Sequence, residues 1–171
     1  MQQIYGAIIE LLDVDKQYIT AIDTVLGGSS QHIVVENDQS AREAIAWLKK
    51  TNSGRATFLP LSSIQARSIP AALKARIQEH EGFVGIAAEL VHADAKYKKA
   101  IHHLMGHVVI TKTLKDANEI AQIVERRYRI VTLAGDVVNP GGSMSGGAQK
   151  KKSEFLIHKR KRPAGNNRYT W

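Results

Sequence analysis

The chain contains an internal repeat, which limits its possible folds more than any other feature. Residues 6–11 read Gly-Ala-Ile-Ile-Glu-Leu, and residues 85–90, at an offset of 79, read Gly-Ile-Ala-Ala-Glu-Leu. Asp94 and Tyr97 then follow the second copy at the same distances at which Asp15 and Tyr18 follow the first. Solenoids need at least about three repeats. We therefore expect one fold built from two similar halves.

The similarity resumes farther along the chain after a few deleted residues. Ala41 and Glu43 match Ala117 and Glu119, and residues 55–59 match 129–133. From these matches we predict a first half at residues 6–61, a connecting helix within 62–84 and a second half at 85–147.

Composition restricts the chain further. A chain of 171 residues can bury one good core, as a single domain or as two closely packed subdomains. It has no cysteine, which excludes disulfides and thiolate metal sites. We see neither a signal-peptide pattern nor an apolar stretch approaching the length of a membrane span. We expect a cytoplasmic protein with no membrane partner.

Positive charge is concentrated near the C-terminus. The net charge is +8, and residues 150–171 hold eight lysines and arginines but only one carboxylate, Glu154. The rest of the chain is close to neutral, so any affinity for nucleic acid depends on local patches. Residues 151–171 lack hydrophobic periodicity. We expect them to be a basic, disordered tail, or a remnant of cloning.

Strand and helix patterns alternate in each half. We predict a strand over residues 6–12 and a helix with the apolar stripe of Tyr18, Ile22 and Val25, which ends at Gly27. The predicted strand at 32–35 leads into a helix capped by Asn37 or Asp38, and a strand at 56–59 closes the half. The helix after Asn37 is expected to bury Ala41, Ala44, Ile45 and Leu48.

The second half is expected to repeat this order. We predict strands at 85–91, 108–110 and 130–133 with helices between them, and a hairpin into Val137 and Val138 through the turn at 134–136. A separate helix should open near Pro70 in the connection. The predicted fold class is α+β, a mixed α/β arrangement of two pseudo-repeated subdomains with mixed sheets and flanking helices.

A glycine-rich strip spans residues 139–147, which read Asn-Pro-Gly-Gly-Ser-Met-Ser-Gly-Gly. Four glycines in seven residues remove the side chains that keep two backbones apart. A phosphate loop would need Gly-Lys-Ser/Thr, but Ala148 and Gln149 follow Gly147. A dinucleotide fingerprint is also excluded, because these glycines follow Asn139 and Pro140 instead of leading from a buried first strand into a helix. We expect another polypeptide to approach the strip.

With this strip, the sequence resembles the hinge domain of a bacterial structural maintenance of chromosomes (SMC) protein, the condensin type. The resemblance is carried by Gly-Gly-Ser-Ser-Gln-His-Ile-Val-Val at 27–35, Gly-Arg-Ala-Thr-Phe-Leu-Pro-Leu at 54–61, and the segment 131–147 that includes the strip. With the repeat, it covers about residues 4–150, and we place the hinge domain at 1–150.

The resemblance implies a ring-shaped homodimer in which each copy offers an edge to its partner twice. It also implies a role in chromosome condensation and partition near the nucleoid, with the hinge joining two long coiled-coil arms. No sustained heptad repeat flanks the body of this chain. ATP hydrolysis would belong to head domains absent from this chain, so we expect no catalytic residue, metal or cofactor here.

The predicted site residues fall into two groups. At the dimer interface we expect Asn139, Pro140, Gly141, Gly142, Gly146 and Gly147. The resemblance also implies DNA binding, with single strands often preferred, and the basic positions that match are Lys49, Lys50, Lys150, Lys151 and Lys152. For Lys49 and Lys50 the alternative is that cations favour a helix C-terminus, by about 0.3–1 kcal/mol. Arg55 and Lys112 are weaker candidates.

Other functions remain open at this point. A small-molecule α/β enzyme could use the glycine strip to bind a phosphorylated ligand, if converging polar groups formed a pocket beside it. A structural dimeriser could instead bind DNA only through the tail. His102, His103 and His107 suggest a metal site, but Gly106 interrupts their helix and no carboxylate completes the set.

Overall fold

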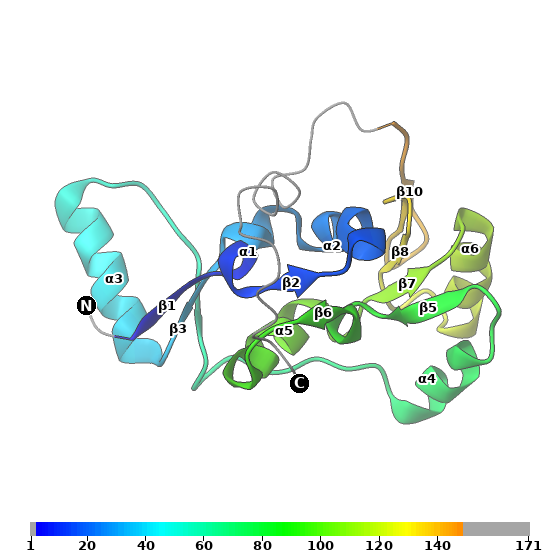
Figure 1. The fold of residues 1–171 in the computed structure, drawn as a ribbon, viewed down its shortest axis with the longest axis horizontal. Helices are drawn as coiled ribbons and strands as arrows, with labels where there is room; N and C mark the ends of the chain where they lie inside the picture. The colour runs from blue at the N-terminus through cyan, green and yellow to red at the C-terminus, as the bar shows by residue number, and fades with distance from the viewer. Residues whose placement is uncertain (1–2, 149–171) are drawn as a thin grey trace.

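The computed structural model describes residues 3–148, in which two mixed sheets flank a central group of elements (Figure 1). The first sheet has the order β1 (Ile4–Ala7), β3 (Ile33–Val35), β4 (Phe58–Pro60). The second has the order β10 (Met144–Ser145), β9 (Val137–Val138), β8 (Ile130–Thr132), β7 (Val109–Thr111), β5 (Phe83–Ile86). The mixed α/β fold class predicted from the sequence is confirmed.

The repeat is present in the strand topology. β1 runs antiparallel to β3, which is parallel to β4, and β5 runs antiparallel to β7, which is parallel to β8. Gly6 lies opposite Val34 and Gly85 opposite Ile110, each beside a register irregularity. The offset of 79 found in the sequence therefore joins structurally equivalent strands.

One sequence match is shifted by two residues. Phe58 pairs with Ile33, and Ile130 pairs with Val109, so the counterpart of Phe58 is Ile130 and not Thr132. A shift of two residues leaves every strand side chain on the same face, because the strand period is two. Sequence similarity alone could not exclude this slip.

The helices also occur in equivalent pairs. α3 (Asp38–Thr51) stands over the first sheet and α6 (Leu114–Ile123) over the second, at opposite ends of Figure 1. Asn37 Oδ1 accepts from Ser40 N at 2.9 Å, as Thr113 Oγ1 accepts from Asp116 N at 3.1 Å. Each cap satisfies a free N–H of the first helical turn. The predicted cap at Asn37 is confirmed.

The remaining helices lie mainly between the sheets. They are α1 (Ile8–Leu11), α2 (Ile19–Leu26) and α5 (Lys98–Met105), with 3-10 turns at Lys16–Tyr18, Gly27–Gln31, Ala87–Leu90 and Ala95–Tyr97. α4 (Ala71–Gln78) follows Pro70, as predicted, and lies beside α6 and β5.

The predicted strands at 6–12 and 85–91 are too long. β1 ends at Ala7 and is followed by α1, while β5 ends at Ile86 and is followed by a 3-10 turn. Ile8, Ile9, Leu11 and Leu12 are all buried, so the apolar run is nearly continuous and its periodicity does not separate a strand from a helical turn.

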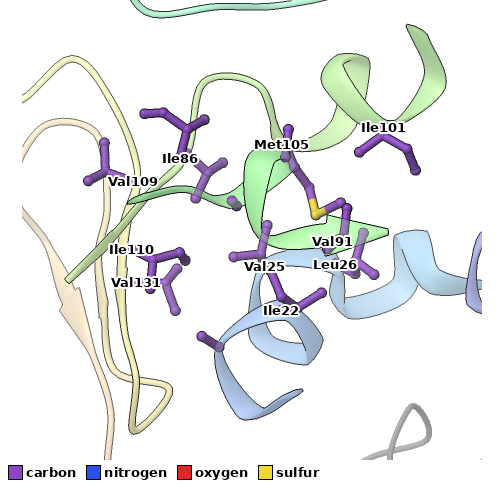
Figure 2. Packing of buried hydrophobic residues seen from close by; sticks show 14 of the residues in the cluster. Ile22, Val25, Leu26, Ile86, Val91, Ile101, Met105, Val109, Ile110 and Val131 are labelled. Atoms are coloured by element: carbon purple, nitrogen blue, oxygen red, sulfur yellow. The ribbon is translucent and has the colours of Figure 1, made fainter. Parts of the chain in front are cut away.

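A two-stranded ribbon joins the halves. β2 (Asp13–Val14) pairs antiparallel with β6 (Val91–His92), so one strand comes from each half. A single hydrophobic cluster surrounds the ribbon, and Figure 2 shows α2 contributing Ile22, Val25 and Leu26 beside Val91 and Met105. The two sheets therefore share one core.

Ile45 contradicts a sequence prediction. Ala41 and Ala44 are buried on α3 as expected, but Ile45 is 40% exposed. Its counterpart in α6 is Ala121, which is only 2% exposed because β9 packs beside α6. Among the described residues, the first sheet has no strand in the place of β9, so this side of α3 stays open.

The chain between β4 and α4 packs closely along α5. Arg67 N donates to His102 O at 3.2 Å, and His103 Nδ1 donates to Gln65 O at 2.8 Å. A Cβ on Gly106 would overlap the Arg67 carbonyl, so only glycine fits where the connection crosses the end of α5.

We predict that Gly106→Ala destabilises the fold by about 1–3 kcal/mol, because backbone must move to admit the methyl group. Gly28→Ala is the control, since a Cβ there meets no atom within 4 Å. Urea unfolding measures both variants. Equal stabilities for the two variants would show that the connection does not depend on this contact.

Two histidines beside the connection are held neutral. Burial lowers the pKa of His32 and of His107, the nearby His103 contributes to both, and Arg67 and Arg129 contribute further at His107. Each has a buried Nδ1 without a hydrogen-bond partner among the described residues. Protonation therefore favours the unfolded chain.

We predict that the free energy of unfolding decreases as the pH falls below about 6.5, the ordinary histidine pKa. In that range the unfolded chain binds protons that the folded His32 and His107 do not. Urea unfolding between pH 7.5 and 5, with the double variant His32→Gln/His107→Gln alongside, measures the slope. An unchanged slope in the double variant would contradict this assignment.

Candidate functional site

The glycine strip forms a tight hairpin. Asn139 N donates to Ser143 O at 2.7 Å, Gly142 N donates to Asn139 O at 2.9 Å, and Met144 of β10 pairs with Val138 of β9. Pro140 is exposed in the turn. The strip is thus a turn followed by the last strand of the second sheet.

Backbone angles or contacts within one copy of the chain account for glycine at each of the four positions. Gly141, Gly142 and Gly147 have φ angles of +91°, +106° and +130°, which L side chains rarely adopt. A Cβ on Gly146 would overlap the Asp136 carboxylate. A Cβ on Gly141 or Gly147 would meet no atom within 4 Å, so the space beside them is open to another molecule. Their place at a dimer interface remains a prediction.

Beside the strip, β10 has one side of its backbone that no strand of residues 3–148 pairs with. Ser143 O accepts from Asn139 N, and Gly147 N donates to Asp136 Oδ1 at 3.3 Å. The backbone N–H and C=O groups of the odd-numbered residues in this segment therefore point toward β9. By strand alternation the N–H and C=O of Met144 point away from β9. β10 therefore ends the second sheet with an open edge.

The first sheet ends with a similar open edge at β4. Thr57 O and Leu61 N bond to β3, at 2.9 Å each, so the backbone of Phe58 between them points to the open side. In the second sheet the equivalent edge of β8 is covered by β9, where Thr132 N bonds to Asp136 O at 2.9 Å. Pro60 stands in the place of Thr132 and has no N–H to donate, so only a short strand can pair with β4.

The outer edges of β1 and β5 are less suited to pairing. Both strands carry a register irregularity, beside Gly6 and Gly85. Such irregularities twist a strand and interrupt its ladder, which protects an edge against association. Among the terminal strands of the two sheets, β4 and β10 are the regular ones.

Exposed apolar side chains accompany both open edges. The four large apolar residues exposed in the described chain are Ile4, Ile45, Trp47 and Met144. Met144 belongs to β10, and Ile45 occupies the position on α3 at which Ala121 of α6 faces β9. Beside Ala121 is a hollow of about 240 Å³, lined by Asn118, Ala121, Gln122, Arg126, Val138, Gly142 and Met144.

This hollow does not support the alternative of an enzyme that binds a phosphorylated ligand. Arg126 is its single cation, and the glycines beside it form a hairpin turn and not the N-terminus of a helix. A phosphate site would need several backbone N–H groups aimed at one point. Gly141 N is instead bonded to Arg126 O at 2.8 Å and Gly142 N to Asn139 O.

The predicted basic residues are only partly described. Lys49 and Lys50 are exposed in the last turn of α3, where the helix dipole alone would favour them. They lie in a part of α3 that has no counterpart in the shorter α6. Lys150, Lys151 and Lys152 lie outside the described residues.

The sequence reasoning missed a second basic surface. Residues 61–78 and 95–112 contain no Asp or Glu, and the structure packs the first part of the former along α5. Lys99 Nζ donates to Leu61 O at 3.1 Å, and its neighbour Lys98 is exposed. Arg67 is exposed farther along the connection, where its backbone N–H donates to His102 O. The signal available in the sequence was the absence of acids from both segments.

The histidines do not form the suggested metal site. His102 Nδ1 donates to Lys98 O at 3.0 Å and His103 Nδ1 to Gln65 O, which orients both rings. Within residues 3–148, these histidines do not belong to any group of three ligand atoms close enough together to hold one ion. The group of His80, Asp116 and Glu119 offers ligand atoms within 4.8 Å of one another. However, His80 Nδ1 accepts from Gly82 N, so Nε2 keeps its proton and donates to Glu119 at 2.8 Å. In that arrangement neither ring nitrogen of His80 has a lone pair free for a metal ion.

Every helix between residues 3 and 148 is too short or too polar to span a lipid bilayer.

Comparisons with known proteins agree with this geometry. A family model described as "SMC proteins Flexible Hinge Domain" matches residues 1–121. The chromosome partition protein Smc of Bacillus subtilis (strain 168) is 51% identical over 154 residues, which are 90% of this chain but 13% of the relative. The chain thus spans about an eighth of that relative's length.

Solved hinge structures superpose on the chain. The SMC hinge domain of Geobacillus stearothermophilus, solved as an asymmetric dimer, matches with a TM-score of 0.86 and 52% identity over 92% of this chain and 63% of that one. The Pyrococcus furiosus Smc hinge with an extended coiled coil matches with a TM-score of 0.73 and 29% identity over 93% and 56%. By sequence and by fold, the chain belongs to the family of SMC hinge domains.

Proposed function

We propose that this chain is the homodimerisation hinge of a chromosome partition protein. The observation that carries the proposal is the open edge of β4, whose counterpart β8 is covered by β9 within the same chain. In the dimer, β10 of one copy would supply the missing neighbour of β4 in the other. The solved hinge of G. stearothermophilus is itself a dimer, which supports this proposal.

The two edges are compatible in length and chemistry. β10 has two residues and β4 has three, of which Pro60 cannot donate a hydrogen bond. Each copy offers both edges, so a twofold arrangement forms two equal contacts and closes. Ile45 would then lie near the hollow beside Met144 of the partner. Both of these exposed apolar side chains would become buried on dimerisation.

We predict that Met144→Pro weakens the dimer by about tenfold or more, because it removes an N–H that points to the partner. Proline is tolerated at an edge position whose N–H faces outward, so the protomer should remain folded. Sedimentation equilibrium at micromolar concentration measures the change.

Met144→Leu is the matched control, since it keeps the N–H and the apolar side chain. This position is preferable to the glycines, whose replacement also strains the hairpin within one copy. An unchanged dimer in folded Met144→Pro would show that β10 does not pair with β4.

We further propose that the domain binds DNA through exposed cations, with single strands preferred. The support is the family resemblance together with Lys49 and Lys50, which have no counterpart in α6. The basic surface of α5 and its connection, around Arg67 and Lys99, adds a second candidate. Exposed aromatic side chains that could stack on bases are few, so phosphate contacts should dominate and make binding sensitive to salt.

We predict that Lys49→Glu/Lys50→Glu lowers the affinity for single-stranded DNA about tenfold and reduces the salt slope by about 0.7 per lost phosphate contact. Lys16→Glu/Lys115→Glu is the control with the same change in charge at other exposed positions. Fluorescence anisotropy at several salt concentrations, with single and double strands, measures both.

The chain ending at Gly147, compared with the chain ending at Lys152, separates the contribution of Lys150, Lys151 and Lys152. An equal loss of DNA affinity in the control variant and in the Lys49/Lys50 variant would show a general effect of net charge. Full affinity in both the Lys49/Lys50 pair and the chain ending at Gly147 would contradict the proposed sites.

For the whole protein we propose a cytoplasmic role at the nucleoid, with the hinge joining coiled-coil arms and ATP hydrolysed by head domains outside this chain. The support is the similarity to Smc proteins, of which the chain spans 13% in B. subtilis. We propose that the hinge itself needs no cofactor.

A further inference from the structure

α3 has a second exposed side, which the proposed dimer does not cover. Trp47 is 49% exposed and lies on the side of α3 opposite to Ile45. Ile4, at the start of β1, is 38% exposed. Their counterparts in the second half are Ile123 and Phe83, which are partly buried and pack against the core. The same two positions are thus covered in one half and exposed in the other.

In the second half, α4 lies on the corresponding flank. It precedes β5 by four residues and contacts both α6 and β5. Ile77 of α4 is fully buried, and His80, just after α4, bonds to Glu119 of α6. In Figure 1, α4 lies next to one end of α6, at the entry to β5. The chain therefore enters β5 along α6.

Gln3, the first described residue, lies near the start of α3 as Gly82 lies near the start of α6. Glu36 N donates to Gln3 O at 3.0 Å, and at the equivalent place Lys112 N donates to Gly82 O at 2.9 Å. Gly82 passes so close to Asp116 that a Cβ would overlap its carboxylate, whereas the counterpart of Asp116 is the small, buried Ser40. Gln3 thus takes the place before β1 that Gly82 takes before β5.

We propose that, in the full-length protein, the segment directly upstream of β1 forms a helix that packs on α3 over Trp47, in the place that α4 takes on α6. The Smc relatives are far longer than this chain, which leaves room for such a segment. Long helical side chains generally point back toward the helix N-terminus, so we expect the exposed Trp47 ring to lie over the turn around Glu43. The helix would fix the direction in which the chain enters the hinge.

Tryptophan fluorescence tests this contact. The sequence has two tryptophans, so Trp171→Phe leaves Trp47 as the single reporter. We compare this chain with the same chain extended by about 30 of its native upstream residues, a helix of about 45 Å if fully formed. Acrylamide quenching of Trp47 should fall about twofold or more on extension, because the indole loses much of its exposed surface.

A second reporter distinguishes this proposal from dimerisation. Ile45→Trp in the background Trp47→Phe/Trp171→Phe reports on the flank toward β4, whose protection should depend on protein concentration and not on the extension. Protection of Trp47 that persists in dilute monomers supports the upstream helix even if the dimer model fails. Unchanged quenching of Trp47 on extension, or equal protection of both flanks by the extension, overturns the proposal.

Discussion

The antiparallel pairing of β2 with β6 holds the two sheets against one core. One strand comes from each half, with Val14 opposite Val91, and the surrounding cluster draws side chains from both halves. Val91 is fully buried, so the halves cannot separate without exposing apolar surface, at about 25 cal/mol for each Å². The relative position of the β4 and β10 edges is therefore a property of the single copy.

The two halves share the same strand topology but differ in the elements that cover their sheet edges and helices. β9 covers β8 and α4 covers a flank of α6, whereas β4 and both flanks of α3 are uncovered in the described chain. The exposed large apolar side chains follow this difference. Met144 lies in the open strand β10, and Ile45 lies on α3, which contacts β4. Ile4 and Trp47 lie where α4 has no equivalent among the described residues. Single exposed apolar residues are normal on a protein surface. Exposed apolar residues that occur together where a neighbouring element is absent indicate a surface that another segment covers.

Local signals in the sequence predicted much of the fold. The repeat, the cap at Asn37 and the helix after Pro70 follow from neighbouring residues and were confirmed. Ile45 was predicted to be buried because a helical stripe shows only which residues share a side, and not whether that side has a neighbour. The pairing of strand edges is non-local, so the sequence indicated the glycine strip but not the open edge of β4. The basic surface along α5 was missed because it joins two distant segments.

The geometry of the hairpin within one copy explains the glycines of the strip. Their presence therefore does not by itself indicate a dimer interface. Positive φ angles at Gly141 and Gly142 close the turn between β9 and β10, and Asp136 fills the space beside Gly146. A monomer with this hairpin would need the same glycines. Their presence is thus weak evidence for a partner, and the stronger evidence is the outward backbone of Met144 that the hairpin presents, since an unpaired edge is a template for another strand.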